Sequence, residues 1–134
     1  MAGYSGTPLA RKLGIREGAL VGLAGAPEEL PALLEPLPAG AVVTRWVPAG
    51  ADVVLLFVTR RRDLERRFAE LAARLDRAGG LWVCWPKRAS GRPTDLDEHA
   101  VRAHGLAAGL VDNKVCAVDE TWSGLRFVYR LADR

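Results

Sequence analysis

Short apolar runs alternate along the chain with amphipathic segments and with loops that contain proline or glycine. The clearest run covers 53–58 (VVLLFV), and shorter runs cover 19–24 (ALVGLA), 41–47 (AVVTRWV) and 81–85 (LWVCW). Runs of this length that are apolar on both faces are typical of parallel strands in the middle of a sheet. The pattern therefore predicts four strands in a mostly parallel sheet.

Amphipathic segments between these runs predict helices. The clearest helix prediction covers 60–78, because its apolar residues recur every three or four positions and share one face. That apolar stripe consists of Leu64, Phe68, Leu71 and Leu75. Further helices are expected at 27–34 and from Thr94 onward, where a threonine N-cap precedes an acidic first turn.

The C-terminal part of the chain predicts a hairpin. A short strand at 115–118 is followed by a turn at 119–124 and by a strand at 125–131 with alternating apolar and polar residues. Such alternation indicates a half-exposed antiparallel strand near the edge of a sheet. The predicted fold class is α/β and Rossmann-like, a mostly parallel sheet with flanking helices and a C-terminal antiparallel hairpin. We expect one domain over 1–134, with a helical lead-in at 1–13.

Composition and charge narrow the possible partners. The net charge of +3 is small, and acidic residues balance most of the basic ones. We therefore do not expect nucleic acid as a partner. No apolar run reaches the ~20 residues of a membrane helix, and no signal pattern opens the chain, so no membrane contact and a cytoplasmic location are expected. Cys84 and Cys116 lack metal-ligand spacing and are expected as buried thiols.

Three segments resemble the class I S-adenosylmethionine-dependent methyltransferases. They are LGIREGALV at 13–21, ADVVLLFV at 51–58 and GGLWVCWPK at 79–87, and they match the first, fourth and fifth strands of that family. The resemblance implies a glycine-rich loop after the first strand and an acid at the end of the second. The chain has AGAPE at 24–28 and WVP at 46–48 instead. We therefore expect a degenerate methyltransferase-like fold without a cofactor.

A second resemblance extends along nearly the whole chain. The segments YSGTPLARKLGI, ADVVLLFVT, WPKRASG, TDL and LVDNKVCAVDETWSGLRFV are similar to recurring segments of a family of small uncharacterised proteins from high-GC bacteria. That family carries no assigned activity. The resemblance therefore bears on the fold and leaves the function open.

The loop at 85–95 is the main candidate for a binding site. It follows the carboxyl end of a central strand and precedes a helix, and open α/β sheets bind ligands at this edge. The loop combines positive charge, a hydroxyl group and a glycine that allows close backbone approach. Its candidate ligand-binding residues are Lys87, Ser90, Gly91, Thr94 and Asp95. A phosphate or carboxylate site is predicted, with a solvated basic loop as the alternative.

Acidic residues on either side of the strand at 115–118 extend this candidate edge. Asp112 precedes the strand, Asp119 follows it, and Trp122 lies in the next turn. The two acids are too far apart along a strand to share one cation, so no metal site is expected. The alternative is that they are ordinary turn residues and that Trp122 anchors the hairpin.

No complete catalytic arrangement is present in the sequence. The sequence favours a non-catalytic binding or regulatory module on a degenerate methyltransferase-like fold. Its partner would be an unknown small anionic ligand or a protein. One alternative is an enzyme or a nucleotide- or anion-binding protein that uses the loop 87–95. The other is an oligomerisation or partner-protein module whose surfaces carry Trp46, Trp82 and Trp122.

Overall fold

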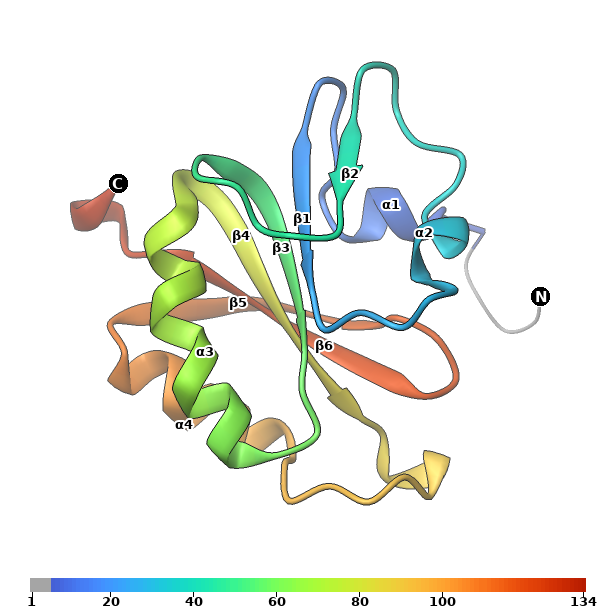
Figure 1. Ribbon diagram of the computed structural model, residues 1–134. Coiled ribbons are helices and arrows are strands. Elements are labelled where there is room, and N and C mark those ends of the chain that lie inside the picture. The colour runs from blue at the N-terminus through green and yellow to red at the C-terminus, as the bar shows by residue number, and fades with distance from the viewer. Residues whose placement is uncertain (1–5) are drawn as a thin grey trace.

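The computed structural model describes residues 6–134 and arranges their strands in one six-stranded sheet, in the order β2-β1-β3-β4-β6-β5 (Figure 1). The neighbours from β2 to β4 are parallel, whereas β6 is antiparallel to both β4 and β5. The strands are β1 (Leu20–Ala24), β2 (Val42–Thr44), β3 (Ala51–Phe57), β4 (Leu75–Pro86), β5 (Leu110–Ala117) and β6 (Trp122–Tyr129). The helices are α1 (Leu9–Lys12), α2 (Leu30–Leu33), α3 (Arg61–Arg74) and α4 (Glu98–Ala107). The predicted α/β architecture is confirmed, although residues 1–5 of the lead-in lie outside the described part.

The last two strands form the antiparallel pair that was predicted near an edge of the sheet, and the final strand is the second strand from that edge. β6 lies between β4 and β5, so β5 is the edge strand and runs parallel to β4. Leu125 and Phe127 are fully buried in β6. An alternating pattern reports which residues face a core and cannot report which strands lie on either side.

Two helix boundaries differ from the sequence prediction because tertiary pairing replaces the local signal. α3 ends at Arg74 rather than at 78, since Leu75 leaves the helix and pairs with Ala51 of β3. α4 begins at Glu98, and its N-cap is Asp97, whose carboxylate accepts a hydrogen bond from Ala100 N at 2.8 Å. Thr94 is therefore not the cap that the sequence predicted.

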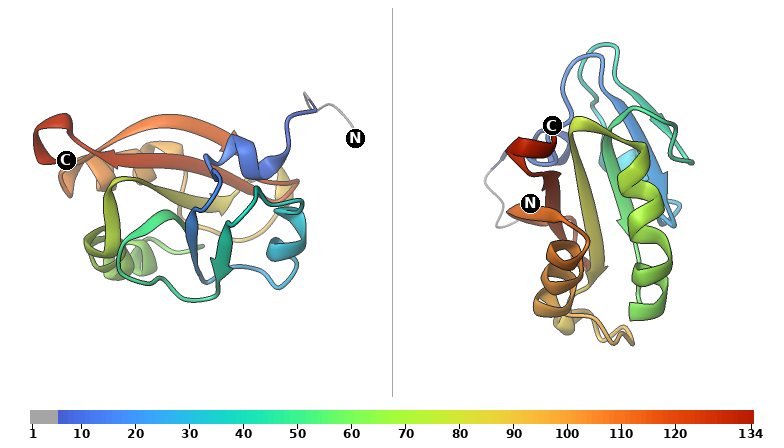
Figure 2. Two further views of the ribbon diagram at one scale, coloured as in Figure 1. Left: turned by 90° about the horizontal axis from the view of Figure 1, so that it is seen from above. Right: turned by 90° about the vertical axis from the view of Figure 1, so that its left-hand side faces the viewer.

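The sheet separates two apolar cores. One lies under α3 and α4, and the other lies under the N-terminal segment with α1 and α2 on the opposite face (Figure 2). In the first core Phe68 meets Phe127 edge to face, with 5.4 Å between the ring centroids. In the second, Trp82 Nε1 donates a hydrogen bond to the carbonyl of Leu13 at 2.9 Å. These contacts hold α3 and the segment after α1 against the sheet.

Within residues 6–134, none of the helices combines the length and the apolar character needed to cross a bilayer.

Candidate functional site

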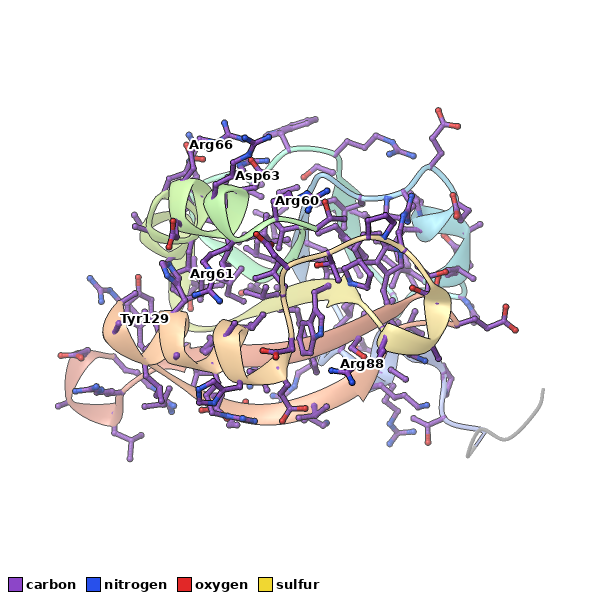
Figure 3. The ribbon with its side chains drawn as sticks, turned by 90° about the horizontal axis from the view of Figure 1, so that it is seen from below. Arg60, Arg61, Asp63, Arg66, Arg88 and Tyr129 are labelled. Atoms are coloured by element: carbon purple, nitrogen blue, oxygen red, sulfur yellow. The ribbon has the colours of Figure 1, made fainter. Side chains whose placement is uncertain are left out.

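A cleft of about 610 Å³ opens at the carboxyl edge of the sheet, where β1 and β3 end. One wall is the loop after β1, and the opposite wall is the first two turns of α3. Figure 3 views this edge directly and shows Arg60, Arg61 and Arg66 around the start of α3, with Arg88 on the loop after β4. Open α/β sheets bind ligands outside the carboxyl ends of their strands, so this cleft is the first candidate site.

The wall after β1 offers few backbone donors. Gly25 turns the chain with φ 68°, and a Cβ there would lie 2.9 Å from the carbonyl oxygen of Phe57. Pro27 has no N–H, and α2 is a single turn preceded by the exposed Glu28 and Glu29. Anions bind where several free N–H groups converge at the start of a longer helix, and this wall lacks that arrangement.

The wall formed by α3 is basic. Arg66 contacts Asp63 at 3.2 Å and Arg67 contacts Glu70 at 3.4 Å. Both are exposed pairs between residues three positions apart, and such pairs contribute only about 0–1 kcal/mol. A bound anion could therefore draw either guanidinium away from its present partner at small cost.

Two residues of the loop 87–95 connect separate elements at this edge. The Thr94 hydroxyl donates to the carbonyl of Thr59 at 2.6 Å, directly after β3. The Asp95 carboxylate accepts a hydrogen bond from Arg61 N at 2.7 Å, at the start of α3. Asp95 thus acts as an N-cap supplied from 34 residues away.

The Ser90 side chain holds the middle of the same loop in place. The Ser90 hydroxyl donates to the Lys87 carbonyl at 2.7 Å and accepts from Arg92 N at 3.1 Å. Gly91 closes the short 3-10 turn with φ 73°. The hydroxyl that the sequence suggested for a ligand therefore has two partners inside the loop, whereas Arg92 projects to the rim of the cleft.

Asp119 and Trp122 build the turn beside this loop. One carboxylate oxygen of Asp119 accepts hydrogen bonds from Thr121 N and Trp122 N, each at 2.8 Å. Trp122 is only 6% exposed and packs edge to face on Phe57, with 5.1 Å between centroids. The Arg92 guanidinium lies 5.3 Å from the centroid of Trp122. Trp122 is thus an anchor below the cleft, and little of it is open to stack on a ligand.

The structure does not bring Asp112 to this edge. Asp112 lies within β5 opposite Phe127, whereas Trp122 lies at the other end of β6, opposite Pro86. The Asp112 carboxylate accepts from Arg102 Nε at 2.9 Å, and Arg102 also pairs with Glu98 at 2.6 Å. The strand predicted at 115–118 begins earlier, at Leu110. Asp112 therefore lies within β5 and forms an ion pair with Arg102 of α4.

The cysteines and the histidines are not among the residues that line the cleft. Cys84 and Cys116 are free thiols, and burial is the main cause that raises the pKa of Cys84 well above its ordinary value. A raised pKa disfavours the reactive thiolate. His104 packs edge to face on Phe68 at 5.2 Å between centroids. Within residues 6–134, no three His, Cys, Asp or Glu residues are grouped so as to hold a metal ion.

Replacing Asp95 with alanine is expected to lower the free energy of unfolding by about 0.5–2 kcal/mol, because Arg61 N loses its N-cap acceptor. Asp95→Asn keeps an acceptor oxygen and should lose less. Urea denaturation measures both variants, and Glu65→Ala on the exposed face of α3 is the control. An unfolding free energy equal to that of the wild type would show that the cap does not stabilise α3.

The residues of the acidic and basic walls of the cleft were not among those predicted to bind a ligand. Glu28, Glu29 and Arg67 all line it. Glu28 and Glu29 follow the strand predicted at 19–24, which was a usable signal, whereas Arg67 lies inside the predicted helix. Only the pairing of β1 with β3 shows that the two segments face each other.

The sheet is mostly parallel, and its reversed strand β6 lies between β4 and β5. This arrangement is a Rossmann-like fold that resembles the fold of methyltransferases. The chain belongs to the family described as a protein of unknown function, DUF3052, whose model matches residues 10–131. No curated protein matches the chain.

Solved structures show the same fold. The chain is similar to the mitomycin 7-O-methyltransferase MmcR, with a TM-score of 0.69 and 14% identity over 92% of this chain and 52% of that one. It therefore spans about half of MmcR. A SAM-dependent methyltransferase from Aquifex aeolicus has a TM-score of 0.62 and 17% identity, over 87% of this chain and 85% of that one. A TehB-like SAM-dependent methyltransferase from Corynebacterium glutamicum has a TM-score of 0.57 and 13% identity, over 96% of this chain and 91% of that one. At these identities the likeness concerns the fold alone.

The residues at the cleft do not fit the nucleoside cofactor that this fold suggests. At the end of β2, where an acid would hold ribose hydroxyls, Arg45 donates through Nη2 to the carbonyl of Glu28 at 3.2 Å. This bond connects the segment after β2 to the loop after β1. Glu28 and Glu29 place two carboxylates on the wall after β1, where the cofactor of this fold would meet a glycine-rich loop.

Proposed function

We propose that this chain is a non-catalytic binding module on a degenerate methyltransferase-like fold, and that its carboxyl-edge cleft binds a small anionic ligand. The observation that carries this proposal is the composition of the cleft. Its lining includes three arginines, Arg66, Arg67 and Arg92, and no His, Cys, Ser or Lys. Its three carboxylates are Glu28 and Glu29 on the opposite wall and Asp63, which is paired with Arg66. Arginine binds oxyanions in a bidentate fashion and remains charged, so it suits recognition more than proton transfer.

Arginines on the α3 wall and on the loop after β4 define where the anion would lie. Arg67 projects from the second turn of α3, and Arg92 reaches over the cleft from the loop after β4. Thr94 and Asp95 hold that loop against β3 and α3 through the two hydrogen bonds described above. In this proposal Thr94 and Asp95 position the arginines and do not themselves contact the ligand.

The calorimetric test uses pyrophosphate and S-adenosylmethionine as probes. Pyrophosphate is expected to bind saturably to the wild type. Arg67→Ala and Arg92→Ala should each weaken it by about tenfold or more, because each removes a charge-assisted hydrogen bond worth about 1.5–3 kcal/mol. S-adenosylmethionine is expected to give no saturable heat.

Arg130→Ala is the matched control, because Arg130 is an exposed arginine that follows β6 at the opposite edge of the sheet. Equal pyrophosphate affinity in the two cleft variants and the wild type would contradict the proposed site. Transfer of a labelled methyl group from S-adenosylmethionine by the purified chain would contradict a non-catalytic role.

The two other functions considered from the sequence have narrower support. An enzyme that uses the loop 87–95 would need the Ser90 and Thr94 hydroxyls, and both are engaged within the protein. A protein-interaction role through three tryptophans is restricted to Trp46, which is 64% exposed, because Trp82 and Trp122 are buried. Trp46 follows the edge strand β2, so a protein partner is the second candidate if pyrophosphate does not bind.

A further inference from the structure

A second cavity, of about 540 Å³, opens at the opposite edge of the sheet. It lies where β1, β3 and β4 begin, at the top of the sheet in Figure 1. The segment 12–19 forms one wall, and the first residues of β3 and β4 form another. This amino-edge cavity shares no lining residue with the carboxyl-edge cleft. The two are therefore separate sites.

Four cationic side chains from separate parts of the chain line the amino-edge cavity. They are Lys12, Arg16, Lys114 and Arg126. Lys114 and Arg126 are directly paired across β5 and β6, so their side chains leave the same face of the sheet. None of the four forms an ion pair with another residue of 6–134. Convergence of unpaired cations on one cavity favours a negatively charged occupant.

Arg126 is built into the floor of this cavity. Its guanidinium lies across Gly80, where a Cβ would approach Arg126 Nε to 2.3 Å. The Nε atom is buried without a hydrogen-bond partner, and Nη1 has only a long contact of 3.4 Å to Asn113 Oδ1. Glycine at position 80 thus makes room for a cation whose charge the surrounding protein leaves uncompensated.

The acids that line the cavity do not supply that compensation. Asp52 accepts a hydrogen bond from Leu20 N at 2.8 Å, and Asp76 accepts from Ala78 N at 3.0 Å. Glu17 is exposed at the rim. Burial is the main cause that lowers the pKa of Arg126, and the charges of Arg134 and Arg16 lower it further. An anion bound beside Arg126 would oppose all three effects.

We propose that the amino-edge cavity binds the phosphate group of a small phosphorylated compound, with Arg126 and Lys114 as the central ligands and Lys12 and Arg16 at the rim. A phosphate monoester carries nearly two charges and three acceptor oxygens, so it can engage several cations at once. A monocarboxylate would gain less from the same four cations, because it carries one charge and two acceptor oxygens. This site is independent of the function proposed for the carboxyl-edge cleft.

The test follows the arginine Nε–Hε resonances by nitrogen–proton correlation NMR during titration with glycerol 3-phosphate. The resonance that disappears in Arg126→Lys is assigned to Arg126. It is expected to shift saturably with glycerol 3-phosphate, not to shift with uncharged glycerol, and to respond more weakly to malonate. Arg126→Lys and Lys114→Ala should each weaken binding by roughly tenfold, measured by calorimetry.

Arg62→Ala on α3 is the control, because Arg62 is exposed and lines neither cavity. Its affinity for glycerol 3-phosphate should match that of the wild type. Lys114 is exposed, so Lys114→Ala tests the site even if a change at Arg126 perturbs the fold. Unchanged affinity in Lys114→Ala, tighter binding of malonate, or no saturable shift in the wild type would overturn the proposal.

Discussion

Replacing Trp82 with alanine is expected to lower the free energy of unfolding by about 3–5 kcal/mol, the range typical of a large aromatic side chain removed from a core. Trp82 is fully buried in β4, and its indole is part of the core under the N-terminal segment. The substitution also removes the donor to the carbonyl of Leu13. Leu13 lines the amino-edge cavity, so weaker phosphate binding should accompany the loss of stability.

Two further variants separate packing from hydrogen bonding at this position. Trp82→Phe keeps an aromatic ring but leaves the Leu13 carbonyl without its donor, so it should lose about 1–3 kcal/mol. Trp46→Ala is the matched control, because Trp46 is 64% exposed and should change the unfolding free energy by no more than about 0.5 kcal/mol. Urea denaturation measures all three. Equal effects at Trp82 and Trp46 would contradict the assignment of Trp82 to a packed core.

Replacing Gly105 with alanine is expected to destabilise the protein by about 2 kcal/mol, although alanine is the better helix former. The gain in helix propensity is about 1 kcal/mol. Against it, a Cβ at position 105 would lie 2.0 Å from Cε1 of Phe127, and overpacking of this severity costs about 3 kcal/mol. The ring cannot easily move, because Phe68 packs edge to face against it. The steric cost therefore exceeds the propensity gain.

Ala103→Gly in the same helix provides the comparison. Ala103 is exposed on α4, so this change should cost only the propensity difference of about 1 kcal/mol. Thermal and urea unfolding of the two variants measure the change in the free energy of unfolding and its sign. A stabilised Gly105→Ala variant would show that α4 can move away from the sheet, and it would contradict the close packing of α4 on β6.

The elements with strong periodic patterns were predicted well. The run VVLLFV lies in and directly after β3, and the apolar stripe of α3 packs on the sheet as its spacing predicted. These patterns depend on burial, which the local sequence records residue by residue. The ends of α3 and α4 were predicted less well, because Leu75 pairs with Ala51 and Asp97 replaces Thr94 as the cap.

The position of the loop 87–95 could be predicted from the sequence, whereas its role in binding a ligand stays a prediction. The loop 87–95 does lie beside a cleft at the carboxyl edge, where the order of strands and helices suggested it. The polar groups chosen there are engaged within the protein, however: Ser90 within the loop, Thr94 with Thr59 and Asp95 with α3. A side chain's hydrogen-bond partners are often distant in sequence, so residue type alone could not separate a ligand contact from a structural one.

The local sequence was sufficient to locate the main strands and helices, and the resemblance to methyltransferases implied that AGAPE and WVP stand where that family has a glycine-rich loop and an acid. Both properties are local, so they can be read from neighbouring residues. Only the tertiary structure placed β6 between β4 and β5, and it thereby set Arg126 across Gly80 and beside Lys114. Such contacts arise from the order in which strands pair, and the pairing of distant strands is decided by how the whole chain buries its apolar surface.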